Sequence, residues 1–216
     1  MIHAMHAWAV QYLDNPVVFH NRMPYYAERV CQECGLVETV WGFIDGTLWK
    51  RCQPSLFQKL MYSACKGCHG IKFQSAVTPD GLFAFMYGLV SGNRHDSFLL
   101  SSSGLLNKLQ EFIPDDAPED TEAAIYSLYG DPAYPQSIQI FGRYKNPSDG
   151  SAQAHWNCQM SKVCEVVEWG FANIHVQCIF LDLRVAMKIF QSCVANIILL
   201  LLSLSIFEPV SMATIP

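Results

Sequence analysis

Three carboxylates have surroundings that suit metal-dependent phosphoryl transfer. Asp45 closes the apolar run "VWGFID" (40–45), and Asp131 closes the apolar segment "AIYSLYGD" (124–131). A carboxylate at the end of a buried strand costs free energy unless it is paired, capped or bound to a cation. If the two strands are neighbours, Asp45 and Asp131 repel each other, and a divalent cation relieves that repulsion. Glu168, in "VCEVVEWGF", could point to the same place from a helix.

Such a triad could hold two Mg²⁺ or Mn²⁺ ions for attack on a phosphodiester. Two ions held by hard oxygen ligands roughly 3.5–4 Å apart can activate a water or a 3′-hydroxyl and steady the leaving oxygen. Common structural roles account for the same residues, because Asp-Gly and Gly-Asp pairs often form turns and a helical glutamate is often solvated. Residue types alone leave both interpretations open.

The strands that must position these residues are expected at three places. The segment 40–45 is one strand, and 71–90 contains two more, joined by the turn "TPDG". Consecutive strands with short turns predict an antiparallel meander. The segment 124–131 is the fourth strand, and the order of elements predicts an α/β fold in which it lies beside the first strand at the centre of the sheet.

Helices are expected on both sides of these strands. Residues 1–35 look helical and amphipathic, and leucines at helical spacing predict a second helix that ends before Pro114. An acidic loop covers 114–123, and a long helix begins near residue 154. Its apolar stripe is formed by Val163, Val167, Phe171 and Ile174.

Composition restricts the class of protein. With 216 residues, 51% of them hydrophobic, the chain can bury one sizeable core. Its formal net charge of −5 opposes binding to the negatively charged phosphates of DNA, so phosphate contacts would depend on a local group of cations. That group is Lys50, Arg51, Lys59, Lys66 and Lys72. A solvated edge that keeps strands from aggregating is the alternative interpretation of the same residues.

Nothing at the start of the chain resembles a signal peptide, and we expect no transmembrane span. The apolar run at 194–207 is shorter than the roughly 20 residues that a bilayer requires. Nine cysteines without a signal peptide predict reduced thiols in a nuclear or cytoplasmic protein. Four of them form a C-x-x-C…C-x-x-C pattern typical of zinc, and "CKGCH" has the spacing of haem attachment: Cys31, Cys34, Cys65 and Cys68.

Four ordered blocks resemble the DDE-type endonuclease domain of PIF/Harbinger transposases and their domesticated relatives. They are "GFIDGT", "KFQSAVTPDGLFAFMYGLVSGNRHDS", "YGDPAYP" and "MSKVCEVVEWGF", and the likeness runs from about residue 41 to 171. The resemblance implies an RNase H-like mixed sheet flanked by helices, and DNA cleavage and joining with divalent metal. It assigns Asp45, Asp131 and Glu168 as the acidic triad, with Asp45 bridging the two ions.

The resemblance also implies secondary residues. Glu165 competes with Glu168 for the third acidic position, since it lies one helical turn earlier. Asp96 and His95, in "GNRHDS", keep a ligand role open, although Asp96 is expected to cap the following helix or to support the site.

In similar sequences the stretch "CKGCH" is a basic strand approach, which makes the cysteine spacing accidental. We therefore expect neither zinc nor haem, and we expect Lys66 and His69 to face phosphate. Together with Lys50, Arg51 and Lys72 they are the candidate DNA contacts.

The resemblance also predicts how the chain is divided. Residues 1–40 would be a helical remnant of a longer N-terminal region, 41–181 the endonuclease domain and 182–216 an eroded apolar tail. A separate DNA-binding protein would then supply target recognition. The departures at Cys65, Gly67, Cys164 and Ala172 fit a truncated or degenerate copy, so an inactive remnant acting as an interaction module remains the alternative function.

Overall fold

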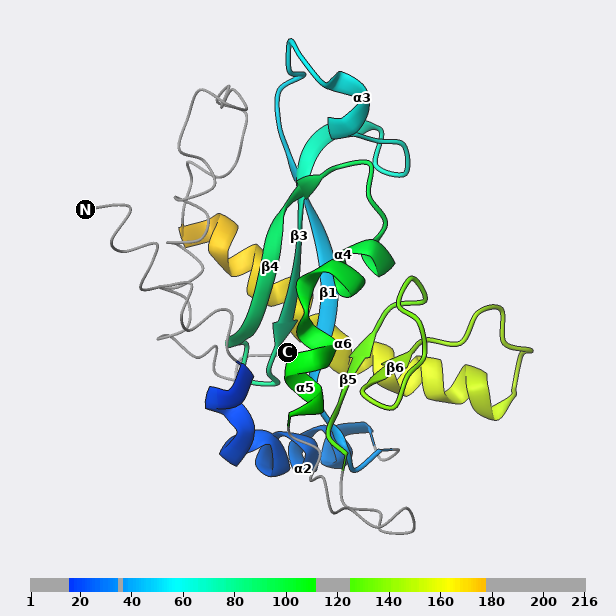
Figure 1. The fold of residues 1–216 in the computed structure, drawn as a ribbon. Coiled ribbons are helices and arrows are strands. Elements are labelled where there is room, and N and C mark those ends of the chain that lie inside the picture. The colour runs from blue at the N-terminus through cyan, green and yellow to red at the C-terminus, as the bar shows by residue number, and fades with distance from the viewer. Residues whose placement is uncertain (1–15, 35–36, 112–124, 178–216) are drawn as a thin grey trace.

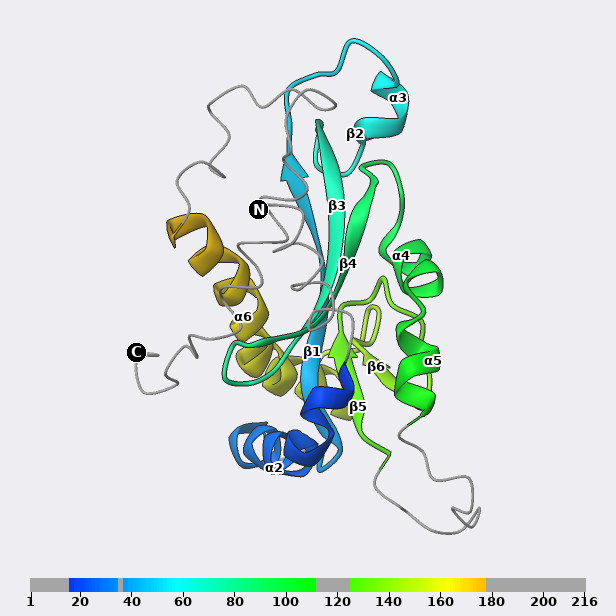
Figure 2. The same cartoon turned by 60° about the vertical axis from the view of Figure 1, so that its left-hand side comes forward.

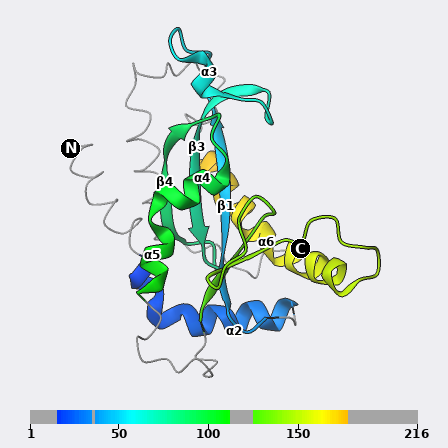
Figure 3. The same ribbon diagram turned by 45° about the vertical axis from the view of Figure 1, so that its right-hand side comes forward.

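The computed structural model describes residues 16–34, 37–111 and 125–177, and for residues 165–177 it describes the helical backbone only. The chain begins with the 3-10 helix η1 (Pro16–Arg22) and helix α2 (Met23–Cys34). These lie at one end of the sheet, whereas the short helix α3 (Gln58–Met61) lies at the opposite end (Figure 3).

A curled mixed sheet forms the centre of the structure. Strands β1 (Val40–Lys50), β3 (Cys68–Val77) and β4 (Phe83–Ser91) pair antiparallel, as expected for the meander. Strand β5 (Ser127–Gly130) pairs parallel with β1, which confirms that these two strands are neighbours. Two further strands, β2 (Tyr62–Ser63) and β6 (Ile140–Gly142), extend the sheet to the order β2-β3-β1-β5-β6, with β4 also on β3 (Figure 1).

Strand β1 is longer than its apolar run. The sequence places the end of this strand at the Asp45-Gly46 turn, and that expectation is wrong. The ladder with β3 continues without a break from Phe43 opposite Val77 to Lys50 opposite Gly70. Because this pairing satisfies the backbone on both sides of Asp45, the Asp-Gly pair lies within an extended strand and forms no turn.

Helices cover both faces of the sheet. Helix α6 (Ala152–Gln177) crosses one face, while α4 (Asp96–Ser103) and α5 (Leu105–Gln110) lie on the other (Figure 2). The single helix expected up to Pro114 is thus two helices. They are separated by Gly104, whose φ of 69° is left-handed backbone that glycine adopts without a Cβ clash.

Each face of the sheet buries its own apolar layer. Phe43, Phe73 and Val77 pack towards Met160 of α6. The alternate strand residues Ile44 and Ala76 pack with Leu100 and Leu105 on the other side. This alternation follows from the two-residue period of a strand, and it makes β1 a strand buried on both faces.

Candidate active site

The register between β1 and β5 brings Asp45 and Asp131 to adjacent positions. Phe43 pairs with Tyr129 and Ile44 pairs with Gly130, so the next residue of each parallel strand is an aspartate. Asp45 remains inside β1, whereas Asp131 directly follows the last residue of β5. The two carboxylates therefore lie at adjacent positions of neighbouring inner strands, one within β1 and one directly after β5.

A pocket of about 630 Å³ opens beside these two residues. Asp45, Asp96 and Asp131 all line it, together with Lys72. Helix α6 contributes Ser161 and Cys164, and the segment between β2 and β3 contributes residues 62–66. The pocket thus collects side chains from β1, β3, α4, α6 and the end of β5.

Asp96 is held by Lys72 instead of by the end of its own helix. Lys72 Nζ donates to Asp96 Oδ1 at 2.9 Å, and the two side chains are 13% and 21% exposed. Asp96 is the first residue of α4, and the N-cap position before it is His95, whose side chain makes no capping hydrogen bond. Its carboxylate thus lies in the pocket and is engaged by Lys72.

Gly46 makes this placement of Asp96 feasible. Its backbone is not left-handed, so no turn requires glycine there. A Cβ at position 46 would instead lie 2.8 Å from the carboxyl carbon of Asp96 and would overlap its Oδ1. The glycine after Asp45 is thus explained by the close approach of a second carboxylate.

Backbone amides fix the two adjacent aspartates. Asp45 Oδ1 accepts a hydrogen bond from the Gly46 N–H at 2.7 Å, and Asp131 Oδ1 accepts one from the Ala133 N–H at 2.9 Å. Asp131 is exposed at the mouth of the pocket, yet the protein atoms around it desolvate the carboxyl and raise its pKa. The charge of Asp96 also raises this pKa, and the Ala133 hydrogen bond opposes the shift.

Two buried tyrosines lie next to these carboxylates. Burial raises the pKa of Tyr134, and the charges of Asp96, Asp45 and Asp131 raise it further, so all three acids lie within electrostatic reach of one phenol. Burial raises the pKa of Tyr129, which lines the pocket, to about 12. Neither hydroxyl has a hydrogen-bond partner among the described residues. Neither tyrosine was among the predicted site residues, although "YGDPAY" places one on each side of Asp131.

The donor set suits a hard divalent cation only in part. Adjacent carboxylates are oxygen ligands that favour a hard divalent cation. Within the described residues, however, no group of three or more His, Cys, Asp and Glu side chains is arranged to hold a metal ion. Glu168 and Glu165 lie in α6, in the part of the helix whose side chains are outside the described residues.

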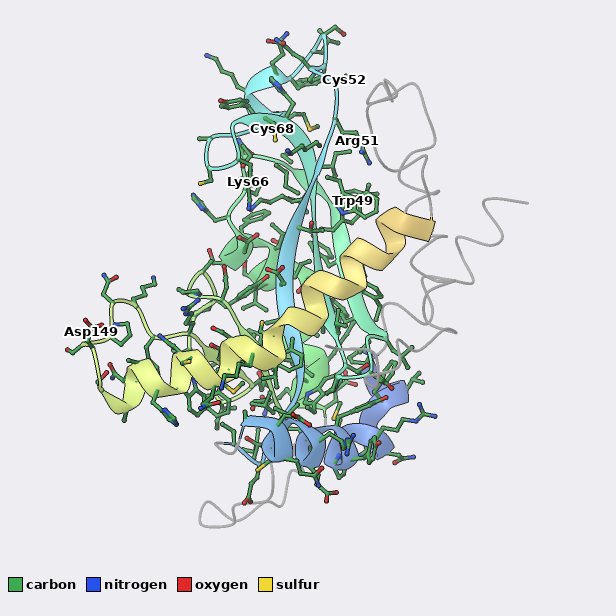
Figure 4. All side chains as sticks on the ribbon, turned by 180° about the vertical axis from the view of Figure 1, so that it is seen from behind. Trp49, Arg51, Cys52, Lys66, Cys68 and Asp149 are labelled. Atoms are coloured by element: carbon green, nitrogen blue, oxygen red, sulfur yellow. The ribbon has the colours of Figure 1, made fainter. Side chains whose placement is uncertain are left out.

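The predicted DNA contacts do not form one exposed surface. Lys50, Lys59 and Lys66 are exposed, whereas Arg51 is only 7% exposed and Lys72 is paired with Asp96. The Arg51 guanidinium donates to the Lys50 carbonyl at 2.8 Å and lies over the Trp49 ring. Burial lowers its pKa to about 10. Figure 4 shows Arg51 and Lys66 on opposite sides of the strands.

Cysteines of the C-x-x-C pairs lie at two ends of the structure. Cys31 and Cys34 belong to α2, and Cys34 is buried in the core. Cys65 lies between β2 and β3, and Cys68 is the first residue of β3. Both belong to the end of the sheet that carries α3, opposite α2 (Figures 1 and 3). All four are free thiols. Spacing in sequence therefore did not translate into a shared site.

In the part of the chain that the structure describes, no helix is long and apolar enough to cross a membrane. The apolar run at 194–207 and the acidic loop at 114–123 both lie outside the described residues.

Comparison with protein families gives one match, in which residues 44–205 fit the family described as DDE superfamily endonuclease. No curated protein and no solved structure matches the chain. The matched range includes the whole pocket-forming part of β1, the strand β5 and helix α6.

Proposed function

Because the chain belongs to the DDE superfamily endonucleases, we propose that its pocket is the active site of a transposase-type nuclease that hydrolyses or joins phosphodiesters of DNA. The observation that carries the proposal is the adjacency of Asp45 and Asp131 on the paired strands β1 and β5. Two carboxylates at neighbouring strand positions concentrate negative charge where a buried apolar sheet reaches solvent. Divalent cations would relieve the repulsion between these carboxylates and would supply the charge that phosphoryl transfer requires.

Glu168 is proposed as the third acid, with Glu165 as its competitor. Ser161 and Cys164 of α6 line the pocket, and Glu168 follows Cys164 by four residues in the same helix. Residues at this spacing share a helix face. Asp45 would bridge two Mg²⁺ or Mn²⁺ ions, while Asp131 and Glu168 each complete one.

Bound divalent ions would supply positive charge to the attacking and leaving oxygens. Neighbouring groups of the protein orient the carboxylates that would hold these ions. The Gly46 amide holds one oxygen of Asp45 and the Ala133 amide holds one oxygen of Asp131, so both carboxylates have a fixed orientation. Lys72 neutralises Asp96 and so keeps a third full negative charge out of the pocket.

Further features of the proposal rest on the resemblance to PIF/Harbinger transposases. They comprise an RNase H-like domain over 41–181, a helical segment at 1–40 and a tail at 182–216. They also comprise DNA contacts by Lys50, Lys66 and His69, recognition through a separate DNA-binding protein, and a nuclear or cytoplasmic location. Ligand roles for His95 and Asp96 belong to the same set, although the Lys72 ion pair already engages Asp96.

An inactive interaction module is the second candidate function. It is favoured by the net charge of −5, which opposes binding to DNA. The substitutions at Cys65, Gly67 and Cys164 point the same way. Calorimetric titration with Mn²⁺ separates the candidates, because an inactive module should show no saturable binding.

Cleavage by an Asp45→Asn variant tests the nuclease. The substitution removes one charge and little volume, so the protein should fold and lose Mg²⁺- or Mn²⁺-dependent cleavage of a DNA duplex. Asp149→Asn is the matched control, because Asp149 is an exposed aspartate in the loop before α6, away from the sheet (Figure 4). Equal cleavage by wild type and Asp45→Asn would refute the assignment.

A further inference from the structure

The segment from the second half of β1 to the end of β3 differs in charge from the rest of the chain. The full sequence has 14 Lys and Arg against 19 Asp and Glu, yet residues 46–79 contain five Lys and Arg and no acidic residue. Three of these five cations, Lys50, Lys59 and Lys66, are exposed at the end of the sheet that carries α3. An acidic protein therefore presents one locally cationic end, which attracts polyanions.

The same end exposes large apolar side chains. Phe57 is 62% exposed and Tyr62 is 42% exposed. Leu56, which precedes Phe57, and Leu60, which lies between the two aromatic residues in the sequence, are exposed as well. Phe57 adopts a φ of 58°, an uncommon conformation for an aromatic residue, immediately before α3. The ring of Tyr62 packs against the ring of His69, with centroids 5.2 Å apart. We call this group of residues, 56–69, the aromatic tip.

The aromatic tip is continuous with the candidate active site. Residues 62–66 line the pocket that contains Asp45 and Asp131, so Tyr62 and Lys66 belong to both surfaces. A polymer bound with one phosphate at the carboxylates would extend directly over these two side chains. The tip is therefore placed to hold the nucleotides next to the reacting bond.

We propose that the aromatic tip binds an unpaired DNA strand, with bases on Tyr62 and Phe57 and phosphates beside Lys59 and Lys66. This inference rests on the proposed function for the identity of the polymer. The partner must be anionic, because the tip carries cations and no carboxylate. It must also offer flat apolar surfaces to exposed rings, and bases do so when they are unpaired, whereas a duplex hides their faces.

Binding without metal tests the proposal independently of cleavage. Fluorescence anisotropy of the full chain would be measured in EDTA at low salt with a labelled oligothymidylate and with a duplex of the same length. We expect tighter binding of the single strand. Tyr62→Ala and Phe57→Ala should each weaken it about five- to one-hundred-fold, which is the range for loss of one base–aromatic stack.

Matched variants show whether the ring is responsible. Tyr62→Phe keeps the ring and should bind like wild type. Tyr25→Ala removes a tyrosine that is 58% exposed on α2, at the opposite end of the molecule, and should also bind like wild type. The tip variants should keep the wild-type circular dichroism spectrum, since neither Phe57 nor Tyr62 belongs to the buried core.

The outcomes separate this inference from the proposed function. Asp45→Asn should bind the oligonucleotide at least as tightly as wild type while losing cleavage, because it removes a negative charge from the pocket. Tyr62-dependent binding without any cleavage by the wild type would support the tip and refute the nuclease. Unchanged binding by Tyr62→Ala and Phe57→Ala, equal weakening by Tyr25→Ala, or stronger binding of the duplex would overturn the tip as a platform for unpaired bases.

Discussion

Lys72 Nζ lies 2.9 Å from Asp96 Oδ1 and ties the middle of strand β3 to the first residue of helix α4. The pair stands in the pocket that Asp45 and Asp131 also line. Lys72 thus compensates one of three carboxylates that would otherwise repel one another, and its charge also lowers the pKa of Asp131. Lys72, which was expected to face DNA, instead forms an ion pair with a carboxylate inside the pocket.

Lys72→Met is expected to lower the free energy of unfolding by roughly 1–3 kcal/mol, because it leaves Asp96 charged, partly buried and without its cation. Urea denaturation followed by circular dichroism measures the loss. Lys162→Met is the control, since Lys162 is an exposed lysine on α6 and its loss should change stability by no more than about 0.5 kcal/mol.

The double variant Lys72→Met, Asp96→Asn identifies the mechanism. If repulsion by the uncompensated carboxylate causes the loss, neutralising Asp96 should restore part of it, and the two changes should couple by about 0.5–3 kcal/mol. Additive effects of the two substitutions would show that the ion pair contributes nothing to stability.

Gly46→Ala is expected to destabilise the protein by roughly 1–3 kcal/mol through overpacking. The new methyl group would overlap Asp96 and push its carboxylate away from Lys72. Thermal or urea unfolding measures the effect, and Asp96→Ala supplies the control in which the space is already open. If Gly46→Ala is equally harmful in the Asp96→Ala background, the approach of Asp96 is not the reason for glycine at this position.

Periodicity and turn chemistry predict much of the fold. The antiparallel strands were recognisable because "TPDG" separates two apolar runs, and α6 because apolar residues recur every three or four positions. The extent of β1 was not predictable from the same rules. Asp45-Gly46 has the local chemistry of a turn, and only the pairing with β3, more than 25 residues later in the chain, keeps it extended.

The site was predictable to the extent that it depends on strand neighbours. The sequence predicted that the strands of Asp45 and Asp131 are neighbours, and the parallel register of β1 and β5 puts the two residues at adjacent positions. The partner of Lys72 was not predictable, because it depends on where α4 begins in space relative to β3. The burial of Arg51 likewise results from packing over Trp49, which a charge count cannot show.

A matched pair of tyrosine variants tests the unsatisfied phenol near the carboxylates. Tyr134→Phe removes a buried hydroxyl without a hydrogen-bond partner among the described residues and should leave stability unchanged or raise it by up to about 1 kcal/mol. Tyr26→Phe removes an equally buried hydroxyl that donates to Asp80 Oδ2 at 2.9 Å. It should cost roughly 1–3 kcal/mol, as a hydrogen bond to a charged acceptor does. A larger loss for Tyr134→Phe than for Tyr26→Phe in urea denaturation would contradict this account.

The salt dependence of DNA binding should reflect the few cations that remain exposed near the pocket. Arg51 is buried and Lys72 is paired, so Lys50, Lys59 and Lys66 are the cations of the 46–79 segment that are left for phosphate. Three neutralised phosphates on a single strand give a slope of about −2 for log K against log[salt], and Lys66→Gln should reduce its magnitude by about 0.7.

Since the rest of the chain is acidic, the affinity of the isolated protein for DNA should be micromolar or weaker at physiological salt, and it should not depend on the DNA sequence. Titrations of labelled oligonucleotides at several salt concentrations measure the affinity, the slope and the change of slope in Lys66→Gln. Tight, site-specific binding, or a slope steeper than about −4, would mean that residues outside this segment supply additional phosphate contacts.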